Sequence, residues 1–184
     1  MSKVRELELR LSRIEEELHL FQKISRLMVR EVPLQQELNS IVALLVEHLE
    51  CDSCIIYLTD GADLVLSASN TAPMSAVGRV RLSTQEGLTG WVARNRRLVA
   101  LSREAYRDSR FKSFPELEAD SYEAFLSAPI IARNRVVGVI NVQHRDVHSY
   151  TGDEMELLTT VGEQIGCLLL LARVDRDALE KPVS

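Results

Sequence analysis

The hydrophobic residues of this chain follow a helical spacing at both ends and a strand spacing in the middle. Residues 34–49 and about 151–174 place apolar side chains three and four positions apart, as amphipathic helices do. Between them lie short apolar or alternating segments that end in turn residues such as Asp60 and Gly61. The expected strands are residues 54–58, 64–69, 79–82, 98–101, 125–132 and 136–142.

This order predicts an α+β fold built on a mostly antiparallel sheet. The terminal helices are expected to cover one sheet face. A short helix over residues 86–93 and the polar, irregular segment 102–122 remain for the other face. A sheet covered by a loop and a short helix favours a concave, partly apolar pocket.

The first thirty residues contain neither proline nor glycine and show the heptad spacing of a coiled coil. The apolar seam is formed by Val4, Leu7, Leu11, Ile14, Leu18, Phe21 and Met28, with Ser25 as its one interruption. The pattern is compatible with a helix packed on its own domain or with a parallel dimer seam, and its length of about four heptads favours the dimer. We therefore expect a dimerisation helix over residues 1–32, a globular domain over 33–174 and a tail over 175–184.

Composition argues against several classes of protein. A net charge of −5 provides no basic field for nucleic acid. The apolar stretch at 165–172 is too short to span a bilayer, and the N-terminus lacks the apolar core of a signal peptide. Three cysteines fit a reducing compartment. We expect a cytoplasmic protein with no membrane partner and no direct nucleic-acid partner.

Two clusters have the residue types of metal or redox sites. His48, Cys51 and Cys54 are spaced like zinc ligands, but no fourth ligand lies nearby and Cys54 opens an apolar strand. His144 and His148 flank Asp146 after the last strand, where we expect a solvated turn. With no motif framing a nucleophile, we expect neither a metal site nor an enzyme.

Several motifs resemble the GAF domain family in order and spacing. They are EGLTGWVA (86–93), RLV (97–99), DSRF (108–111), SAPII (127–131), VGVINV (137–142) and YTGDE (150–154). The resemblance covers about residues 34–172. It is closest to the sensory domains of nitrogen-regulatory phosphotransferase enzyme I and of NifA-type activators. It implies a six-stranded antiparallel sheet with a ligand pocket under the loops.

Departures from the family pattern narrow the expected ligands. Val142 and Met155 stand where cyclic-nucleotide-binding members carry other residues, so we expect no tight binding of cyclic GMP or cyclic AMP. Residues 106–124 contain no cysteine for covalent bilin attachment. The resemblance to enzyme I does not bring phosphotransfer.

The expected function is a sensor that binds a small molecule and relays the signal through terminal helices in a homodimer. The alternatives are a ligand-free dimerisation module that positions an effector and, more remotely, a sulfoxide reductase that uses a cysteine pair. The identity of the ligand and any cofactor stay open. The candidate ligand-binding residues are Tyr57, Ser67, Ser69, Trp91, Tyr106, Phe111, Phe114, Tyr122, Ser127, Asn141 and Gln143.

Overall fold

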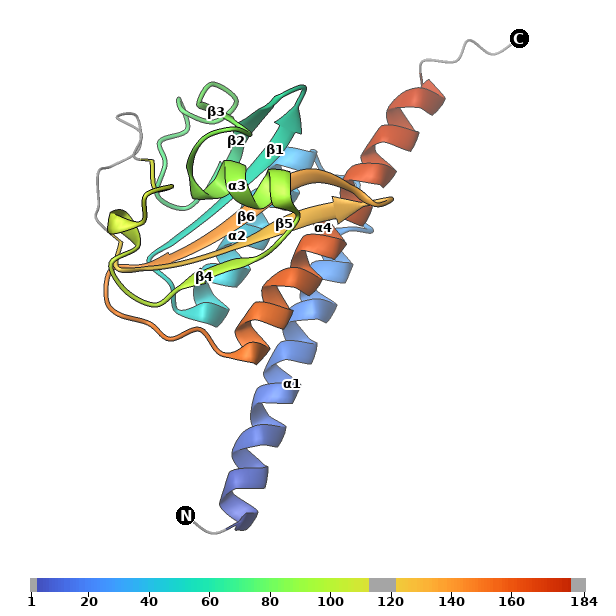
Figure 1. The fold of residues 1–184 in the computed structure, drawn as a ribbon. Coiled ribbons are helices and arrows are strands. Elements are labelled where there is room, and N and C mark those ends of the chain that lie inside the picture. Colours follow the sequence, from blue (N-terminus) through green and yellow to red (C-terminus); the bar gives the residue numbers. More distant parts are fainter. Residues whose placement is uncertain (1–2, 113–121, 180–184) are drawn as a thin grey trace.

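The structure is a computed structural model that describes residues 3–112 and 122–179, with side chains as far as Arg173. Its helices are α1 (Lys3–Leu27), α2 (Leu34–Leu49), α3 (Gly87–Asn95), the 3₁₀ turn η1 (Ala105–Arg107) and α4 (Gly152–Leu179). Its strands are β1 (Ser53–Asp60), β2 (Asp63–Ser69), β3 (Arg81–Ser83), β4 (Val99–Leu101), β5 (Ala124–Ala132) and β6 (Arg135–His144). Figure 1 shows α3 on one face of the sheet and α1, α2 and α4 on the other.

The six strands form one antiparallel sheet in the order β3-β2-β1-β6-β5-β4. The long strands β1, β6 and β5 lie at the centre, while the three-residue strands β3 and β4 close the edges. Short edge strands leave few unpaired backbone groups for another chain to pair with. The expected α+β fold is confirmed.

The sheet separates two hydrophobic cores. The helix-side core joins the apolar stripes of α2 and α4 to one face of β1, β5 and β6, including Ile56, Leu126 and Ile140. The α3-side core joins α3 to the opposite face through residues such as Tyr57 and Phe125. Neighbouring residues of a strand therefore enter different cores, as the period of two requires.

Helix α1 is divided between two environments. Leu20 and Ile24, in its C-terminal half, are buried in the helix-side core. The N-terminal half projects beyond the domain (Figure 1), and its side chains from Lys3 to Glu16 are exposed. Ser25, which interrupts the heptad pattern, accepts a 3.1 Å hydrogen bond from Gln164 Nε2 of α4. The C-terminal half of α1 thus agrees with a helix packed on its own domain, whereas the exposed N-terminal half stays compatible with a dimer seam.

Three sequence expectations need correction. Helix α4 continues to Leu179, so residues 175–179 belong to the helix and not to a tail. The segment 102–122 was expected to be irregular throughout, but η1 lies within it. A β-bulge between Ile56 and Tyr57 shifts the β1–β2 register and leaves Ser67 without a partner residue, which breaks the simple alternation expected for β2.

In the described part of the chain, the span Gly152–Arg173 of α4 is the one segment long and apolar enough to cross a membrane by length and composition. Its buried residues Leu158, Val161 and Ile165 belong to the helix-side core. Core helices of globular domains share this composition, so α4 is accounted for by packing.

Two glycines of α4 allow a test of its close packing on the sheet. A Cβ built on Gly166 would lie 2.6 Å from the carbonyl oxygen of Ile131, whereas one on Gly152 meets nothing within 4 Å. We expect Gly166→Ala to destabilise the fold by about 1–3 kcal/mol through overpacking, and Gly152→Ala to have little effect. Urea unfolding of both variants measures this, and equal stabilities would show that the helix does not approach β5 so closely.

Candidate functional site

A row of polar side chains lies at the centre of the sheet, on the face that α3 covers (the α3 face). The register pairs Ser127 with Asn141 across β5 and β6, and pairs Gln143 with Ser53 across β6 and β1. Paired residues project to the same face, which here is the face that carries Tyr57 and Phe125. All four polar residues are at most 7% exposed, so water is largely excluded from them.

A chain of hydrogen bonds connects part of this row to α3. Ser127 Oγ donates to Asn141 Oδ1 at 2.7 Å, and Asn141 Nδ2 donates to Thr89 Oγ1 at 2.8 Å. Thr89 lies on α3, in the segment EGLTGWVA. These hydrogen bonds therefore fix the short helix α3 over β5 and β6. Ser127 and Asn141 act here as structural groups.

A second polar group lies where β1 and β2 meet. Thr71 Oγ1 is 3.2 Å from Ser53 Oγ and 3.3 Å from Ser69 Oγ. Ser69 also accepts hydrogen bonds from the backbone N–H groups of Thr71 and Ala72. These hydroxyls occupy the same sheet face as Gln143, because Ser53 is its register partner.

Gln143 stands apart from this network. Its Oε1 is buried and has no hydrogen-bond partner among the described residues. A buried acceptor without a partner costs about 1–3 kcal/mol, so native structures rarely keep one without a reason. This oxygen is the polar group of the α3 face that is available to accept a hydrogen bond from a ligand.

The segment that follows β4 covers the same face at one side. Ala105 N donates to Glu123 O at 2.9 Å, which attaches η1 to the residue preceding β5. Ala105 and Phe111 both pack in the α3-side core. Trp91 of α3 is partly buried there, and the Arg110 guanidinium lies 5.0 Å from its ring centroid.

Arg110 is held in place by Asp108. Its Nε donates to Asp108 Oδ1 at 2.9 Å and its terminal nitrogen donates to Oδ2 at 2.8 Å. These hydrogen bonds hold the pKa of Asp108 below its ordinary value. The pair thereby places a fixed cation on the indole face, a favourable arrangement for an aromatic ring.

The candidate residues divide into four groups. Tyr57, Ser69, Trp91, Phe111, Ser127, Asn141 and Gln143 lie on or against the α3 face. Tyr122 is buried beside the start of β5. Two others do not join them: Ser67 Oγ donates to its own strand at Val65 O, and Tyr106 is 37% exposed with Arg107 over its ring. Phe114 lies outside the described residues.

Sequence reasoning missed three polar residues of this face: Ser53, Thr71 and Thr89. Ser53 precedes the apolar residues that define the expected strand 54–58, so the sequence pattern does not include it. Thr71 follows β2 in a turn. The Thr in the segment EGLTGWVA was the available signal for Thr89, but its partner Asn141 is distant in sequence.

The cysteines lie away from this face. Cys51 and Cys54 are both buried in the helix-side core. Burial raises the pKa of Cys51 to about 12 and the pKa of Cys54 well above its ordinary value, so both thiols stay protonated. Within residues 3–112 and 122–179, no group of three or more His, Cys, Asp or Glu side chains is arranged to hold a metal ion.

The turn after β6 is exposed at residues 145–147 and 149, as expected, but His144 at the end of β6 is buried and His148 is partly buried. His144 is 8% exposed, and its ring stacks on that of His148 with centroids 4.0 Å apart. His148 Nε2 lies 2.7 Å from Glu154 Oε1, and His144 Nδ1 lies 3.1 Å from the hydroxyl of Tyr150. Since His144 Nε2 is also 3.4 Å from Leu49 O, this histidine cluster joins the ends of α2 and β6 to the start of α4.

Comparison with known proteins agrees with this architecture. Residues 33–169 match the model of the GAF domain, and the chain belongs to that family. A Salmonella typhimurium protein of the phosphoenolpyruvate-dependent phosphotransferase system is 29% identical over 143 residues. The match covers 77% of this chain but 19% of that protein's length.

Two solved structures show how far the likeness extends. The GAF domain of a phosphoenolpyruvate-protein phosphotransferase from Coxiella burnetii superposes with a TM-score of 0.81 at 26% identity, covering 89% of this chain and 98% of that one. Free methionine-R-sulfoxide reductase from Neisseria meningitidis superposes with a TM-score of 0.73 at 14% identity, covering 86% and 91%. The second likeness shows a common fold alone.

The histidine cluster predicts a pH-dependent stability. Burial, and secondly the adjacent His148, lower the pKa of His144. An unfolded histidine has a pKa of about 6.5, so on acidification the unfolded state takes up this proton first. The folded state is therefore expected to be most stable above about pH 6.5 and to lose stability as the pH falls through that value. Urea unfolding between about pH 5 and 7.5 measures the slope across that range.

A matched pair of variants tests whether His144 causes this pH dependence of the unfolding free energy. His144→Gln should flatten it, while His19→Gln on the exposed part of α1 should leave it unchanged. If His144→Gln keeps the wild-type slope, the buried ring is not the group responsible.

Proposed function

We propose that this domain is a non-enzymatic sensor that binds a small polar molecule on the α3 face and relays its presence through the terminal helices of a dimer. The observation that carries the proposal is the buried Oε1 of Gln143, which has no partner in the described part of the chain, on a face otherwise lined there by paired polar groups and apolar side chains. A ligand with a hydrogen-bond donor would satisfy this oxygen and recover the cost of its burial.

The surroundings of Gln143 favour a ligand that is both polar and apolar. Hydroxyl groups lie on its β1 side and Phe125 is its partner on β5. Trp91 and Phe111 lie in the same α3-side core and supply apolar surface. Pockets with a few convergent polar groups among aromatic side chains are typical of small-molecule sites.

The position of Gln143 also suggests how binding reaches the helices. The next residue is His144, whose ring contacts Tyr150 and the end of α2. His148 and Glu154 continue this contact into the first turn of α4. A ligand that favours one arrangement of this junction by about 1–3 kcal/mol would shift a balanced pair of helix arrangements.

The relatives support a regulatory role. The aligned segment is 19% of the length of the Salmonella typhimurium protein, and the Coxiella burnetii structure is itself the GAF domain of a phosphotransferase. We propose the corresponding role for this chain: a cytoplasmic regulatory domain. Sulfoxide reduction is disfavoured, because Cys51 and Cys54 are buried on the helix side of the sheet with raised thiol pKa values.

The exposed half of α1 supports the dimer. Its seam residues Val4, Leu7, Leu11, Ile14 and Leu18 are 52–63% exposed. In a parallel, in-register coiled coil, Lys3 would face Glu8 and Arg10 would face Glu15 across the interface, and both pairs are attractive. This apolar seam also supports the second candidate function, a ligand-free dimerisation module.

Substitution of Gln143 separates the two candidates. Gln143→Leu should keep or increase the stability of the free protein, since it removes an unsatisfied buried acceptor, but should abolish ligand binding. The measurement is thermal unfolding with a panel of amino acids, nucleotides and organic acids, combined with Trp91 emission. A binder should raise the midpoint for the wild type alone.

Trp91→Phe serves as the companion variant. It should keep the fold and weaken binding if the indole contacts the ligand. A compound that stabilises wild type and Gln143→Leu equally would place the binding site elsewhere. A panel without any binder would favour the ligand-free module.

The dimer has its own test. We expect light scattering at micromolar concentration to give twice the chain mass for the wild type, and one chain mass for Leu11→Glu/Leu18→Glu, because two carboxylates would be buried in the seam. Leu9→Glu is the control: Leu9 is 48% exposed but lies off the seam, so this variant should stay dimeric. A monomeric wild type would overturn the proposed seam.

A further inference from the structure

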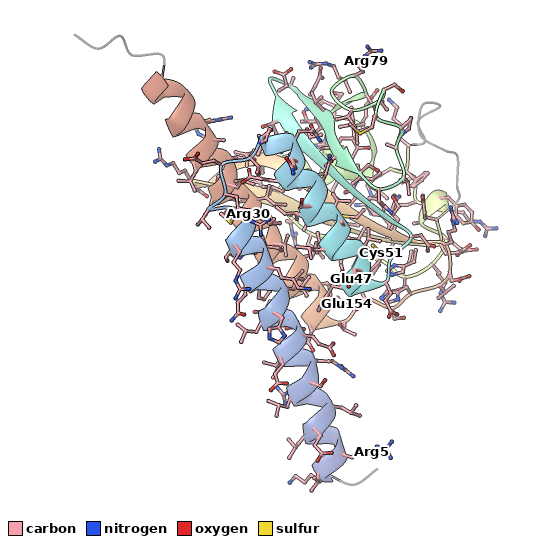
Figure 2. All side chains as sticks on the ribbon, turned by 180° about the vertical axis from the view of Figure 1, so that it is seen from behind. Arg5, Arg30, Glu47, Cys51, Arg79 and Glu154 are labelled. Atoms are coloured by element: carbon pink, nitrogen blue, oxygen red, sulfur yellow. The ribbon has the colours of Figure 1, made fainter. Side chains whose placement is uncertain are left out.

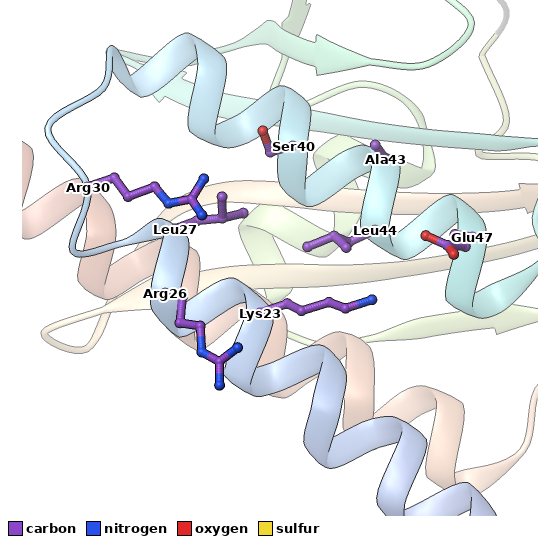
Figure 3. Close-up of a pocket in the computed structure, with 8 residues that line it drawn as sticks. All are labelled: Lys23, Arg26, Leu27, Arg30, Ser40, Ala43, Leu44 and Glu47. Carbon is purple, nitrogen blue, oxygen red and sulfur yellow. The ribbon is translucent and has the colours of Figure 1, made fainter.

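A groove of about 390 Å³ lies between α1 and α2, on the side of the domain opposite α3. It is lined by Lys23, Arg26, Leu27 and Arg30 of α1 and its C-terminal end, and by Ser40, Ala43, Leu44 and Glu47 of α2. Figure 3 shows the two helices running side by side, with the cationic side chains on the α1 wall and Glu47 on the α2 wall.

The α1 wall of the groove carries an unusual concentration of positive charge. Lys23 and Arg26 are three residues apart on α1, and Arg30 follows just beyond the end of the helix at Leu27. All three line the groove and form a cationic stripe along this wall. Residues 18–30 contain no Asp or Glu, although the whole chain has a net charge of −5. None of the three has an ion-pair partner within the described residues.

The floor of the groove is apolar and partly open. Leu27 and Leu44 are partly buried against the helix-side core, and Ala43 is exposed. Glu47 is exposed on the opposite wall and is likewise without an ion-pair partner in the described part of the chain. The groove thus has a cationic wall, an apolar floor and one anionic position.

The coiled-coil seam of α1 leaves this groove free. The exposed part of the seam runs from Val4 to Leu18, whereas Phe21, Ser25 and Met28 pack within the domain. The groove residues of α1 lie C-terminal to this exposed part and at heptad positions outside the seam. A second copy of the chain on the exposed seam would therefore leave the groove open. Charge complementarity then points to an acidic occupant from another protein.

We propose that the α1–α2 groove binds an acidic amphipathic helix of a partner protein. Carboxylates three residues apart on that helix would match Lys23 and Arg26, because the two helices share one rise per residue, and a further carboxylate would reach Arg30 beyond the end of α1. Its apolar side chains would cover Leu27, Ala43 and Leu44, and a basic residue would face Glu47. Helices commonly dock in grooves by this division between apolar anchors and charged flanks.

The proposal is independent of the ligand on the α3 face, so it can fail while the proposed sensor function holds. The probe is a fluorescent helical peptide with a leucine stripe, glutamates on one flank and lysines on the other. Its reference is a peptide of the same composition with the order scrambled. Anisotropy with the full chain is measured at low and at physiological ionic strength, because charge pairing weakens with salt.

The groove variants are Lys23→Glu/Arg26→Glu/Arg30→Glu, which reverses the stripe, and Ala43→Glu, which blocks the floor at an exposed position. The matched control, Arg79→Glu/Arg97→Glu/Arg103→Glu, makes the same change in net charge at exposed sites outside the groove. Figure 2 shows Arg79 far from Arg30 and Glu47.

We expect the ordered peptide to bind at least about tenfold more tightly than the scrambled peptide, and both groove variants to lose about tenfold in affinity. The control should bind like the wild type, and a peptide with its glutamates replaced by lysines should prefer the reversed stripe. Equal binding of the ordered and scrambled peptides, or an equal loss in the control, would overturn the proposal. Groove-dependent binding of anionic phospholipid vesicles without binding of the peptide would also overturn it, in favour of a membrane surface.

Discussion

The alternation of side chains along β6 is the constraint on which the rest of the structure depends. This strand lies between β1 and β5 and pairs with both along most of its length. Its residues enter the two cores in turn: Ile140 and Val142 face the helices, whereas Val139, Asn141 and Gln143 face α3. A register shift of one residue would bury the side-chain amides of Asn141 and Gln143 among the helices and would move Ile140 and Val142 to the α3 face. The register of β6 is therefore strongly determined.

Close backbone contacts fix the layers on both sides of this sheet. Glycines let α4 approach β5 and let α3 approach the end of β3, where a Cβ on Gly90 would lie 2.7 Å from Ser83 O. Such contacts tie the helices to the sheet without long side chains between them. Because packed interiors have little compressibility, these contacts hold the helices in a defined position on the sheet.

The polar features of the domain are distributed along one continuous path. Asn141 holds α3, and Gln143 presents an oxygen that has no partner among the described residues. His144 lies against the end of α2 and stacks on His148, which in turn reaches Glu154 in the first turn of α4. Asn141, Gln143 and His144 are consecutive positions, or positions two apart, on one strand. The proposed ligand site and the junction with the helices thus lie on a single strand, β6.

The sequence by itself determined the order and type of the elements, because the change of hydrophobic period is a local property of the chain. It also indicated that Asn141 and Gln143 share a face, since both lie on one regular strand. Tertiary structure decided what a local pattern does not contain. The bulge opposite Tyr57 removed Ser67 from the expected row, and the pairing of Thr89 with Asn141 joins residues 52 positions apart. Likewise, heptad spacing is the same in both halves of α1, and only packing on α2 and α4 distinguished the buried half from the exposed one.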